Sequence, residues 1–234
     1  MCEQAGPTVF MTPSYCLSQC CDGVLLRQLD RGITAKMEGT LFSPALEGLK
    51  LLKCERGDIQ TKPFLDVCKF VLPILDKFGA SMTVVKADIS GNISRLDSRY
   101  NSNTPRFNYL YSFVQAEIET GTAKSSSSCT NGLLWAMDFI VELFRNLGEH
   151  RDWSMSQACS DSYSKTLKKW HGWLASSSFM VAVKLVPDRK KFMEVLGGED
   201  SYGDMENFCT AFTPILKDIH KFLASCGLDN MKSS

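Results

Sequence analysis

The sequence predicts an all-α protein, and two observations support this fold class. Apolar residues recur at helical spacing from Met37 onward, and segments that alternate polar and apolar residues are nearly absent. The chain has 234 residues, enough for one domain with a sizeable core. No stretch approaches the roughly 20 apolar residues of a membrane-spanning helix, so we expect a soluble protein.

Residues 1–36 differ from the rest of the chain. They mix Pro, Ser, Gln and Gly with four of the ten cysteines and show no sustained period. We therefore predict a poorly ordered N-terminal extension over 1–36 and one folded domain over 37–234. A further hypothesis is that Met37 is the working start of the protein. An intact mass that matches all 234 residues would contradict that hypothesis.

In the first half of the chain, apolar side chains share one helical face in three segments. These faces are Phe42, Leu46, Leu49 and Leu52; Phe64, Cys68, Val71, Leu75 and Phe78; and Phe107, Leu110, Tyr111, Val114 and Ile118. We expect helices over 42–52, 64–78 and 107–118, with a kink at Pro73.

The second half shows the same pattern in four further segments. The apolar faces are Phe139, Ile140, Leu143, Phe144 and Leu147; Leu167, Leu174, Val181 and Leu185; the segment from Pro187 through Leu196; and Phe208, Phe212, Ile215 and Ile219. We expect one long helix over 167–185 and a short helix with Pro187 in its first turn. Gly79, Gly148 and Gly197–Gly198 follow predicted helix ends, where a left-handed cap favours glycine.

Charge and cysteine content exclude several classes of function. Lys+Arg and Asp+Glu are both 26, so no global field favours nucleic acid or a purely electrostatic hold on a membrane. The N-terminus lacks the pattern of a secretory signal, and the ten cysteines are scattered, so we expect reduced thiols and a cytoplasmic protein. Cys16, Cys20 and Cys21 have no partner at zinc spacing, so no metal site is expected.

The segment from Lys86 to Arg95 is the most informative. Asp88, Asn92 and Arg95 follow a spacing of i, i+4, i+7, which places a carboxylate, an amide and a guanidinium on one helical face. Such a face offers oriented acceptors and donors to a polyhydroxylated ligand. The alternative is an exposed hydrogen-bond ladder with no ligand.

His171 and three tryptophans are the other candidates. On the expected long helix His171 shares a face with Leu167, Leu174 and Ser178, so it is either a core histidine or a buried partner for a polar ligand group. Trp135 is either core or a plate on which a sugar ring stacks. At least one of Trp170 and Trp173 should be exposed, where an indole suits a membrane interface.

The sequence contains few features that would indicate an enzyme. The sequence has no glycine-rich phosphate loop, no GxSxG, no HExxH and no paired CxxC. Asp88 and His171 are a conceivable acid–base pair, but no Ser or Cys is identifiable as a nucleophile. We expect neither enzymatic activity nor a cofactor.

At these residues the sequence resembles the glycolipid transfer protein family, especially its plant members. Two long motifs carry the resemblance, Lys86-Ala-Asp-Ile-Ser-Gly-Asn-Ile and Lys168-Lys-Trp-His-Gly-Trp, with Gly132-Leu-Leu-Trp and Lys62-Pro-Phe-Leu-Asp as supporting segments. The resemblance covers 37–228. It implies a two-layer helical sandwich that encloses a hydrophobic lipid chamber.

The resemblance also implies roles for individual residues. Asp88 and Asn92 would bind sugar hydroxyls, Arg95 stands where the family often has Lys, Trp135 would stack on the first sugar, and His171 would bond the ceramide carbonyl. Trp173 would contact the membrane. The chamber positions would be Ile74, Leu75, Phe78, Val85, Leu167 and Phe179.

The function implied is non-vesicular transfer of a glycosphingolipid of the glucosylceramide type between membranes. The ligand would be the main partner, with transient membrane contact, no nucleic acid and a monomeric protein. Two alternatives stay open: a non-transferring glycolipid sensor or interaction protein, and a ceramide-1-phosphate carrier. Phosphate is disfavoured because Arg95 is the one basic residue in 88–95 and the first cation after Trp135 is Arg145.

One departure from the family pattern bears on Trp135. Family members carry three more residues between this tryptophan and the Ala-Met-Asp-Phe that follows. Their loss rotates the flanking halves of the helix by about 60° and shortens it by about 4.5 Å. The upstream half could slide so that Gly132 takes the place of the tryptophan, a bulge could absorb the change, or the serine-rich loop could shorten. We expect fold and chain binding to survive while headgroup selectivity or transfer rate falls.

Overall fold

The computed structural model describes residues 40–125 and 128–229. The chain divides into two compact units, Met1–Glu38 and Gly39–Ser234. The first unit lies outside the described residues, so the extension predicted over 1–36 stays a prediction.

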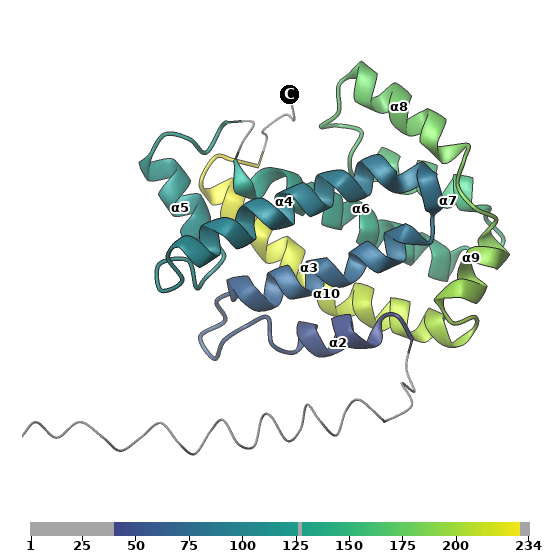
Figure 1. Ribbon diagram of the computed structural model, residues 1–234, viewed down its shortest axis with the longest axis horizontal. Coiled ribbons are helices and arrows are strands. Elements are labelled where there is room, and N and C mark those ends of the chain that lie inside the picture. Colours follow the sequence, from purple (N-terminus) through teal and green to yellow (C-terminus); the bar gives the residue numbers. More distant parts are fainter. Residues whose placement is uncertain (1–39, 126–127, 230–234) are drawn as a thin grey trace, which may run out of the picture. The chain divides into compact units, whose positions relative to one another are not determined.

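The second unit is helical. Within the described ranges there is no β-strand; two isolated antiparallel bridges join Lys53 to Ile59 and Gln60 to Tyr109. The elements, labelled as in Figure 1, are α2 (Ser43–Leu49), α3 (Thr61–Asp76), the 3₁₀ helix η1 (Gly79–Met82), α4 (Thr83–Ser102), α5 (Tyr111–Glu119), α6 (Cys129–Glu149), α7 (Met155–Lys165), α8 (Trp173–Val183), α9 (Arg189–Leu196) and α10 (Asp200–Ser225). The predicted all-α fold is confirmed.

The helices form two layers (Figure 1). α3 and α4 lie side by side in the front layer with α2 next to α3, and α6, α7 and α10 run behind them. The layers meet where α4 packs on α6 and where α2 packs on α10. α4 therefore has one side against the core and one side free to present polar groups.

Phenylalanine side chains fill the space between the layers. Phe42 meets Phe144 edge to face with ring centroids 5.1 Å apart, and Phe208 contacts both rings. Phe64 packs against Phe212 in a tilted arrangement with ring centroids 6.1 Å apart, and all five rings are at most 1% exposed. Burying each ring contributes about 1.5–3 kcal/mol, so these contacts hold the two layers together.

The single long helix expected over 167–185 is wrong. α7 ends at Lys165, α8 begins at Trp173, and the residues between them form a connection. Gly172 caps α8 in an extended conformation with φ −68° and ψ 174°, which interrupts the helical path. Glycine also disfavours a helix interior by about 1 kcal/mol relative to alanine. His171 therefore lies on the connection and not on a helical face with Leu167.

Other helix ends differ from the prediction by a few residues. Pro187 precedes α9 instead of starting it, and the Asp188 side chain caps this helix by accepting from the Lys191 N–H at 3.2 Å. Gly79 and Gly198 have positive φ of 64° and 68°, as a left-handed cap requires. Gly148 lies inside α6, so its predicted role as a cap is wrong.

A buried glutamate fixes the start of α6. Glu117 of α5 accepts the Cys129 backbone N–H at 2.9 Å and the Ser128 hydroxyl at 3.0 Å. A carboxylate at this position also interacts favourably with the helix dipole. From this start α6 stays α-helical to Glu149, so the backbone does not absorb the three-residue difference after Trp135 as a bulge.

Six cysteines fall within the described residues, and all six are free thiols: Cys54, Cys68, Cys129, Cys159, Cys209 and Cys226. Burial raises the pKa of Cys159 and of Cys209 to about 12. Both thiols therefore stay protonated at neutral pH, which makes them poor nucleophiles.

Candidate functional site

The predicted polar face of α4 is formed by three residues on successive turns. Asp88 and Arg95 are exposed, whereas Asn92 between them is fully buried. The Arg95 guanidinium donates a hydrogen bond to Oδ1 of Asn92. The face thus combines a carboxylate acceptor, an amide and a cation, and the central amide reaches into the protein.

The amide nitrogen of Asn92 is a buried donor without a hydrogen-bond acceptor among the described residues. Nδ2 is inaccessible to solvent and has no hydrogen-bond partner of acceptable geometry among the described residues. A buried unsatisfied donor costs about 1–3 kcal/mol. Native proteins rarely keep such a group without a reason, and a ligand oxygen would remove the cost.

The Asp88 carboxyl is influenced by several neighbours. Partial desolvation raises its pKa, while Arg95, His171 and the amide of Asn92 act in the opposite direction because each favours the ionised form. The structure therefore brings His171, from the connection after α7, close to Asp88 on α4. Sequence spacing could not predict this proximity.

His171 is held by a residue that sequence analysis missed. The Tyr163 hydroxyl lies 3.2 Å from Nδ1 of His171 and 2.9 Å from the Ser176 hydroxyl. These three residues come from α7, the connection and α8. The sequence carries no periodic signal for the cluster because the chain changes direction twice between Tyr163 and Ser176.

Partial burial also sets the charge of His171. Desolvation lowers its pKa, and the opposing influence of Asp88 does not reverse the shift, so the imidazole is neutral at pH 7. A neutral imidazole has one donor and one acceptor nitrogen. The Tyr163 hydroxyl donates its one proton to the Ser176 hydroxyl, so towards His171 it is placed as an acceptor for an Nδ1 proton. For Nε2 to donate to a ligand carbonyl, the Tyr163 proton has to turn from Ser176 to Nδ1.

The tryptophans have different surroundings. Trp173 is the first residue of α8 and is 80% exposed, while Trp170 is 7% exposed with the Lys169 ammonium 4.6 Å from its ring centroid. The expectation that at least one of this pair is exposed is confirmed. Trp135 lies on α6, but its side chain is outside the described part of the structure.

The predicted chamber residues belong to the apolar core. Five are buried and Val85 is half-buried; the buried ones are Ile74, Leu75, Phe78, Leu167 and Phe179. Tyr163 joins this region to the polar site, because its ring stacks on Phe179 at 4.0 Å while its hydroxyl contacts His171. Polar groups and a hydrocarbon interior therefore meet at one residue.

Comparison with known proteins decides the family. The profile of the glycolipid transfer protein family matches residues 59–198. Glycolipid transfer protein 1 of Arabidopsis thaliana is 64% identical over 202 residues, a match that covers 85% of this chain and 100% of that protein. The chain belongs to the glycolipid transfer protein family. Glycolipid transfer protein 2 of the same plant is 38% identical, over 85% of this chain and 96% of that protein.

Solved structures of the family share the fold. A structure of FAPP2, described as selecting simple glycosphingolipids with the GLTP fold, superposes with a TM-score of 0.75 at 25% identity and covers 84% of this chain and 100% of that one. Human ceramide-1-phosphate transfer protein in complex with a 12:0 ceramide-1-phosphate has a TM-score of 0.72 at 17% identity, over 82% of this chain and 99% of that one. This glycolipid transfer protein relative thus has the expected family architecture.

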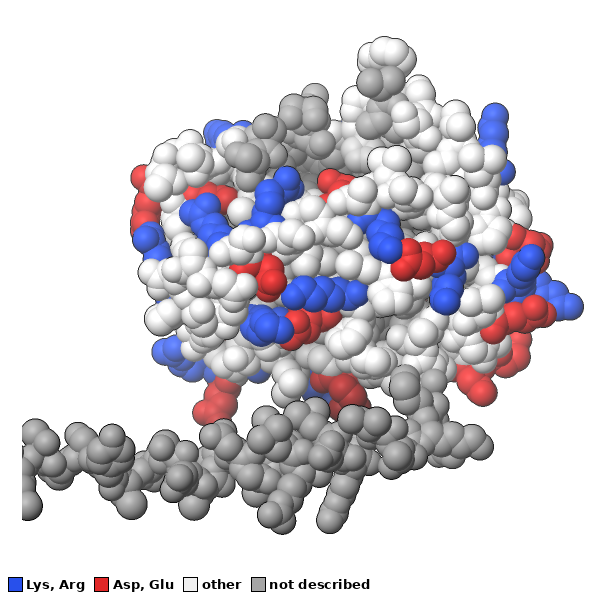
Figure 2. Space-filling view, viewed as in Figure 1, with Lys and Arg blue, Asp and Glu red and all other residues white. Residues whose placement is uncertain are grey.

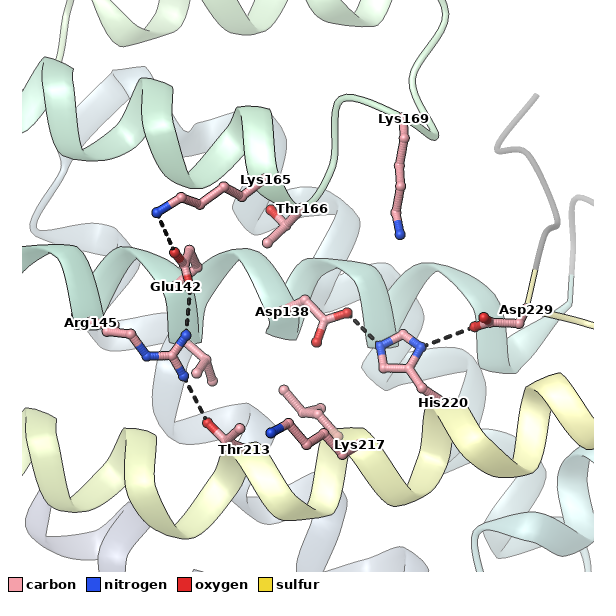
Figure 3. A pocket seen from close by; sticks show the side chains of 12 residues that line it. Asp138, Glu142, Arg145, Lys165, Thr166, Lys169, Thr213, Lys217, His220 and Asp229 are labelled. Atoms are coloured by element: carbon pink, nitrogen blue, oxygen red, sulfur yellow. Dashed lines mark hydrogen bonds and ion pairs between the residues drawn. The ribbon is translucent and has the colours of Figure 1, made fainter.

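A second polar cluster lies on the side of α6 that faces α10 (Figure 3). It lines a cavity of about 330 Å³, in which His220 is hydrogen-bonded to Asp138 through Nε2 at 2.6 Å and to Asp229 through Nδ1 at 3.2 Å. The hydrogen bond that His220 donates to the Asp138 carboxylate is the main cause that raises the pKa of His220, and Asp229 adds to it. This histidine is therefore satisfied on both nitrogens.

The first cation of α6 after Trp135 belongs to this second cluster. Arg145 pairs with Glu142 at 2.6 Å and donates to the Thr213 hydroxyl at 3.1 Å (Figure 3). Lys165 holds the other oxygen of Glu142 at 3.0 Å. In this member of the glycolipid transfer protein family Arg145 is thus engaged with α10 and does not add a cation to the polar face of α4.

Proposed function

We propose that the protein carries a glycosphingolipid of the glucosylceramide type between membranes and returns it chemically unchanged. The observation that carries this proposal is the buried Asn92 between the exposed Asp88 and Arg95, whose Nδ2 has no hydrogen-bond partner of acceptable geometry among the described residues. A ligand with several hydroxyls and an amide can satisfy this set of donors and acceptors at once. Membership of the glycolipid transfer protein family supports the same ligand class.

The headgroup site consists of the residues expected from the sequence, extended by two. Asp88 and Asn92 accept from and donate to sugar hydroxyls, Arg95 adds a fixed fork of donors, and Trp135 is the stacking plate. His171 binds the amide carbonyl of the ceramide with a neutral imidazole. Tyr163 and Ser176 position that imidazole.

The hydrocarbon chains enter the core beneath this site. Each CH₂ removed from water contributes about 0.8 kcal/mol, so leaving a long acyl chain exposed would cost on the order of 10 kcal/mol. The apolar side chains at Ile74, Leu75, Phe78, Val85, Leu167 and Phe179 provide the lining. Chain burial gives most of the affinity, and the polar site gives selectivity because one lost partner costs about 1–3 kcal/mol.

α8 is the membrane contact. Trp173, Met180, Val181 and Leu185 expose apolar surface along this helix and just after it, and Trp173 is the most exposed of them. On the face that Figure 2 shows, basic and acidic side chains are interspersed, so no single-sign patch there replaces this apolar contact. No helix of the described ranges is long and apolar enough to cross a bilayer. The contact is therefore superficial and transient, as a cytoplasmic carrier requires.

The proposal further includes a monomeric folded domain over 37–234, no covalent chemistry and no nucleic-acid partner. Non-transferring lipid sensing is the alternative for a chain with a displaced Trp135. Ceramide-1-phosphate binding needs several cations around one site. Arg145 is engaged elsewhere, which argues against a phosphate ligand.

Vesicle-to-vesicle transfer of labelled glucosylceramide tests the proposal. We expect transfer of this lipid to exceed that of ceramide-1-phosphate, and native mass spectrometry to show one unmodified lipid per protein. Asp88→Val should reduce transfer by about tenfold or more, because one charge-assisted hydrogen bond is worth about 1.5–3 kcal/mol.

Asp138→Val is the matched control, since it removes a carboxylate of α6 that binds His220 of α10 and not the headgroup site. Full glucosylceramide transfer by Asp88→Val would overturn the proposed site. If the protein retained glucosylceramide but did not transfer it between vesicles, the non-transferring lipid sensor would be established instead.

A further inference from the structure

A buried carboxylate links three helices beside the polar face of α4. Glu117 of α5 accepts a hydrogen bond from the Cys129 backbone N–H at 2.9 Å and another from the Ser128 hydroxyl at 3.0 Å. The oxygen that accepts from Cys129 also forms an ion pair with the Arg99 guanidinium of α4, at 3.7 Å. Glu117 and these three partners thus form an anchor that holds the start of α6 to α4.

The anchor lies close to the headgroup residues. Burial raises the pKa of the Cys129 thiol, and Glu117 adds to the rise. The guanidinium groups of Arg99 and Arg95 act in the opposite direction, because a nearby cation favours the thiolate. Cys129 also lines the same surface as both arginines. Since Arg95 belongs to the proposed headgroup site, the start of α6 is held next to that site.

The anchor resists displacement because it is dry. Glu117, Ser128 and Cys129 are at most 6% exposed, so a broken hydrogen bond is not replaced by one to solvent. A buried carboxylate that loses its partners is strongly destabilising. The backbone oxygen of Glu117 also accepts from the N–H groups of Thr122 and Ala123, at 2.8 and 3.1 Å, which folds the chain after α5 back onto the same residue. The start of α6 is therefore fixed in position.

Trp135 follows the anchor on the same helix. It lies six residues after Cys129, and α6 is α-helical throughout this stretch. At 1.5 Å and 100° per residue, its backbone is placed about 9 Å from Cys129 along the helix axis and at one angle around it. Because α4 packs on α6, a shift of the anchored end would move Trp135 relative to Asp88 and Asn92.

We propose that Glu117 is a positioning residue of the headgroup site: by holding the start of α6 against α4, it sets where Trp135 meets the first sugar. The inference rests on the proposed function, in which Trp135 is the stacking plate, and it adds a residue that does not touch the lipid. Ceramide offers no sugar ring to stack on. Glu117 therefore governs the preference for glycosylated lipid and not the burial of the hydrocarbon chains.

A double-mutant cycle between Glu117→Gln and Trp135→Ala tests this inference. Glutamine keeps the shape of glutamate and one acceptor oxygen but removes the charge that pairs with Arg99. Vesicle transfer of labelled glucosylceramide is measured for wild type, both single variants and the double variant. We expect Glu117→Gln to slow transfer by about threefold to tenfold, the loss of roughly one hydrogen bond. In the Trp135→Ala background the same change should alter transfer by less than about twofold, because the residue through which Glu117 acts is gone.

Two further measurements distinguish positioning from a general loss of structure. Native mass spectrometry should show that Glu117→Gln retains ceramide as wild type does, since chain burial is unchanged. Addition of glucosylceramide should change the tryptophan emission of wild type more than that of Trp135→Phe, and this difference should shrink in Glu117→Gln.

Glu142→Gln is the matched control, because it removes a carboxylate that pairs with Arg145 and Lys165. We expect this variant to transfer glucosylceramide at the wild-type rate. If Glu117→Gln does not fold, Ser128→Ala takes its place in the cycle, since it removes one hydrogen bond of the same carboxylate from outside α5.

The outcomes separate this inference from the proposed function. If wild type transfers glucosylceramide and Glu117→Gln slows it equally with and without Trp135, the glutamate is only structural and the inference is wrong. Wild-type transfer by Glu117→Gln or by Trp135→Ala would also overturn it, while the carrier function would stand. If wild type transfers no glucosylceramide, the proposed function falls and the inference falls with it.

Discussion

Two histidines in separate polar clusters, His171 and His220, have opposite surroundings. His171 lies near Asp88, on the same polar face as the Asn92 Nδ2 that has no partner among the described residues, and desolvation lowers the pKa of His171. His220 lies between Asp138 and Asp229, and its pKa is raised (Figure 3). In the α4 region the Asn92 Nδ2 has no hydrogen-bond partner among the described residues. In the α6–α10 region both nitrogens of His220 are hydrogen-bonded within the protein.

This difference separates a binding site from a structural cluster. A buried polar group that is fully paired inside the protein supports the fold, and a buried group left unpaired costs stability until a ligand arrives. Mutations in the two regions should therefore affect different measurements. The α4 region should govern lipid transfer, and the α6–α10 region should govern stability.

The sharpest comparison uses two buried asparagines. Asn92→Ala should reduce glucosylceramide transfer by about tenfold or more with a smaller loss of stability, because its Nδ2 makes no hydrogen bond of acceptable geometry among the described residues and only its Oδ1 is bonded, to Arg95. Asn146→Ala should cost about 2–3 kcal/mol of unfolding free energy, because its Nδ2 donates to Asp161 and to Ser162, both at 2.9 Å. Urea denaturation and vesicle transfer of both variants provide the measurements. The contrast fails if Asn92→Ala is the less stable of the two.

Substitution of the residues that position His171 should reduce lipid transfer by a smaller factor. Tyr163→Phe keeps the ring that stacks on Phe179 but removes the hydroxyl that contacts Nδ1 of His171. We expect transfer to fall by about three- to tenfold, the loss of roughly one hydrogen bond. Ser176→Ala should have a weaker effect, since the Tyr163 hydroxyl keeps its contact with Nδ1 and its proton, no longer donated to Ser176, can go to Nδ1. Nitrogen NMR of the imidazole reports the tautomer, and an unchanged tautomer in Tyr163→Phe would contradict the positioning role.

The smallest expected effect is on how the unfolding free energy changes with pH. His220 has a raised pKa, so its contribution to stability is fully present below the unfolded histidine value of about 6.5 and is lost as pH rises through the folded value. His220→Gln should therefore lower the unfolding free energy more at pH 6 than at pH 9. For His171 the sign is opposite, because its lowered pKa favours the folded state above about pH 6.5 and this contribution is lost on acidification.

Histidine NMR titration of the wild type checks both shifts. We expect the resonance of His220 to titrate at a higher pH than that of His171. Coincident titration of the two would show that the surroundings of the two imidazoles do not differ as described.

The sequence by itself determined the fold class and the polar face of α4. Helical periodicity needs only local spacing, and Asp88, Asn92 and Arg95 share a face because they lie within one uninterrupted helix. The two motifs that resemble the glycolipid transfer protein family also identified the family, which the comparisons confirm.

Only the tertiary structure decided how separate segments meet. The break at Gly172 removed His171 from a helix, and packing of α7 and α8 then placed it against Tyr163 and near Asp88. The burial of Asn92 likewise depends on helices that pack over it and not on its own neighbours in sequence. Residues within one helix are related by a fixed geometry, but contacts across helix ends depend on the turn between them. For that reason the polar face of α4 was predictable from the sequence, whereas the position of His171 beside Tyr163 and Asp88 was not.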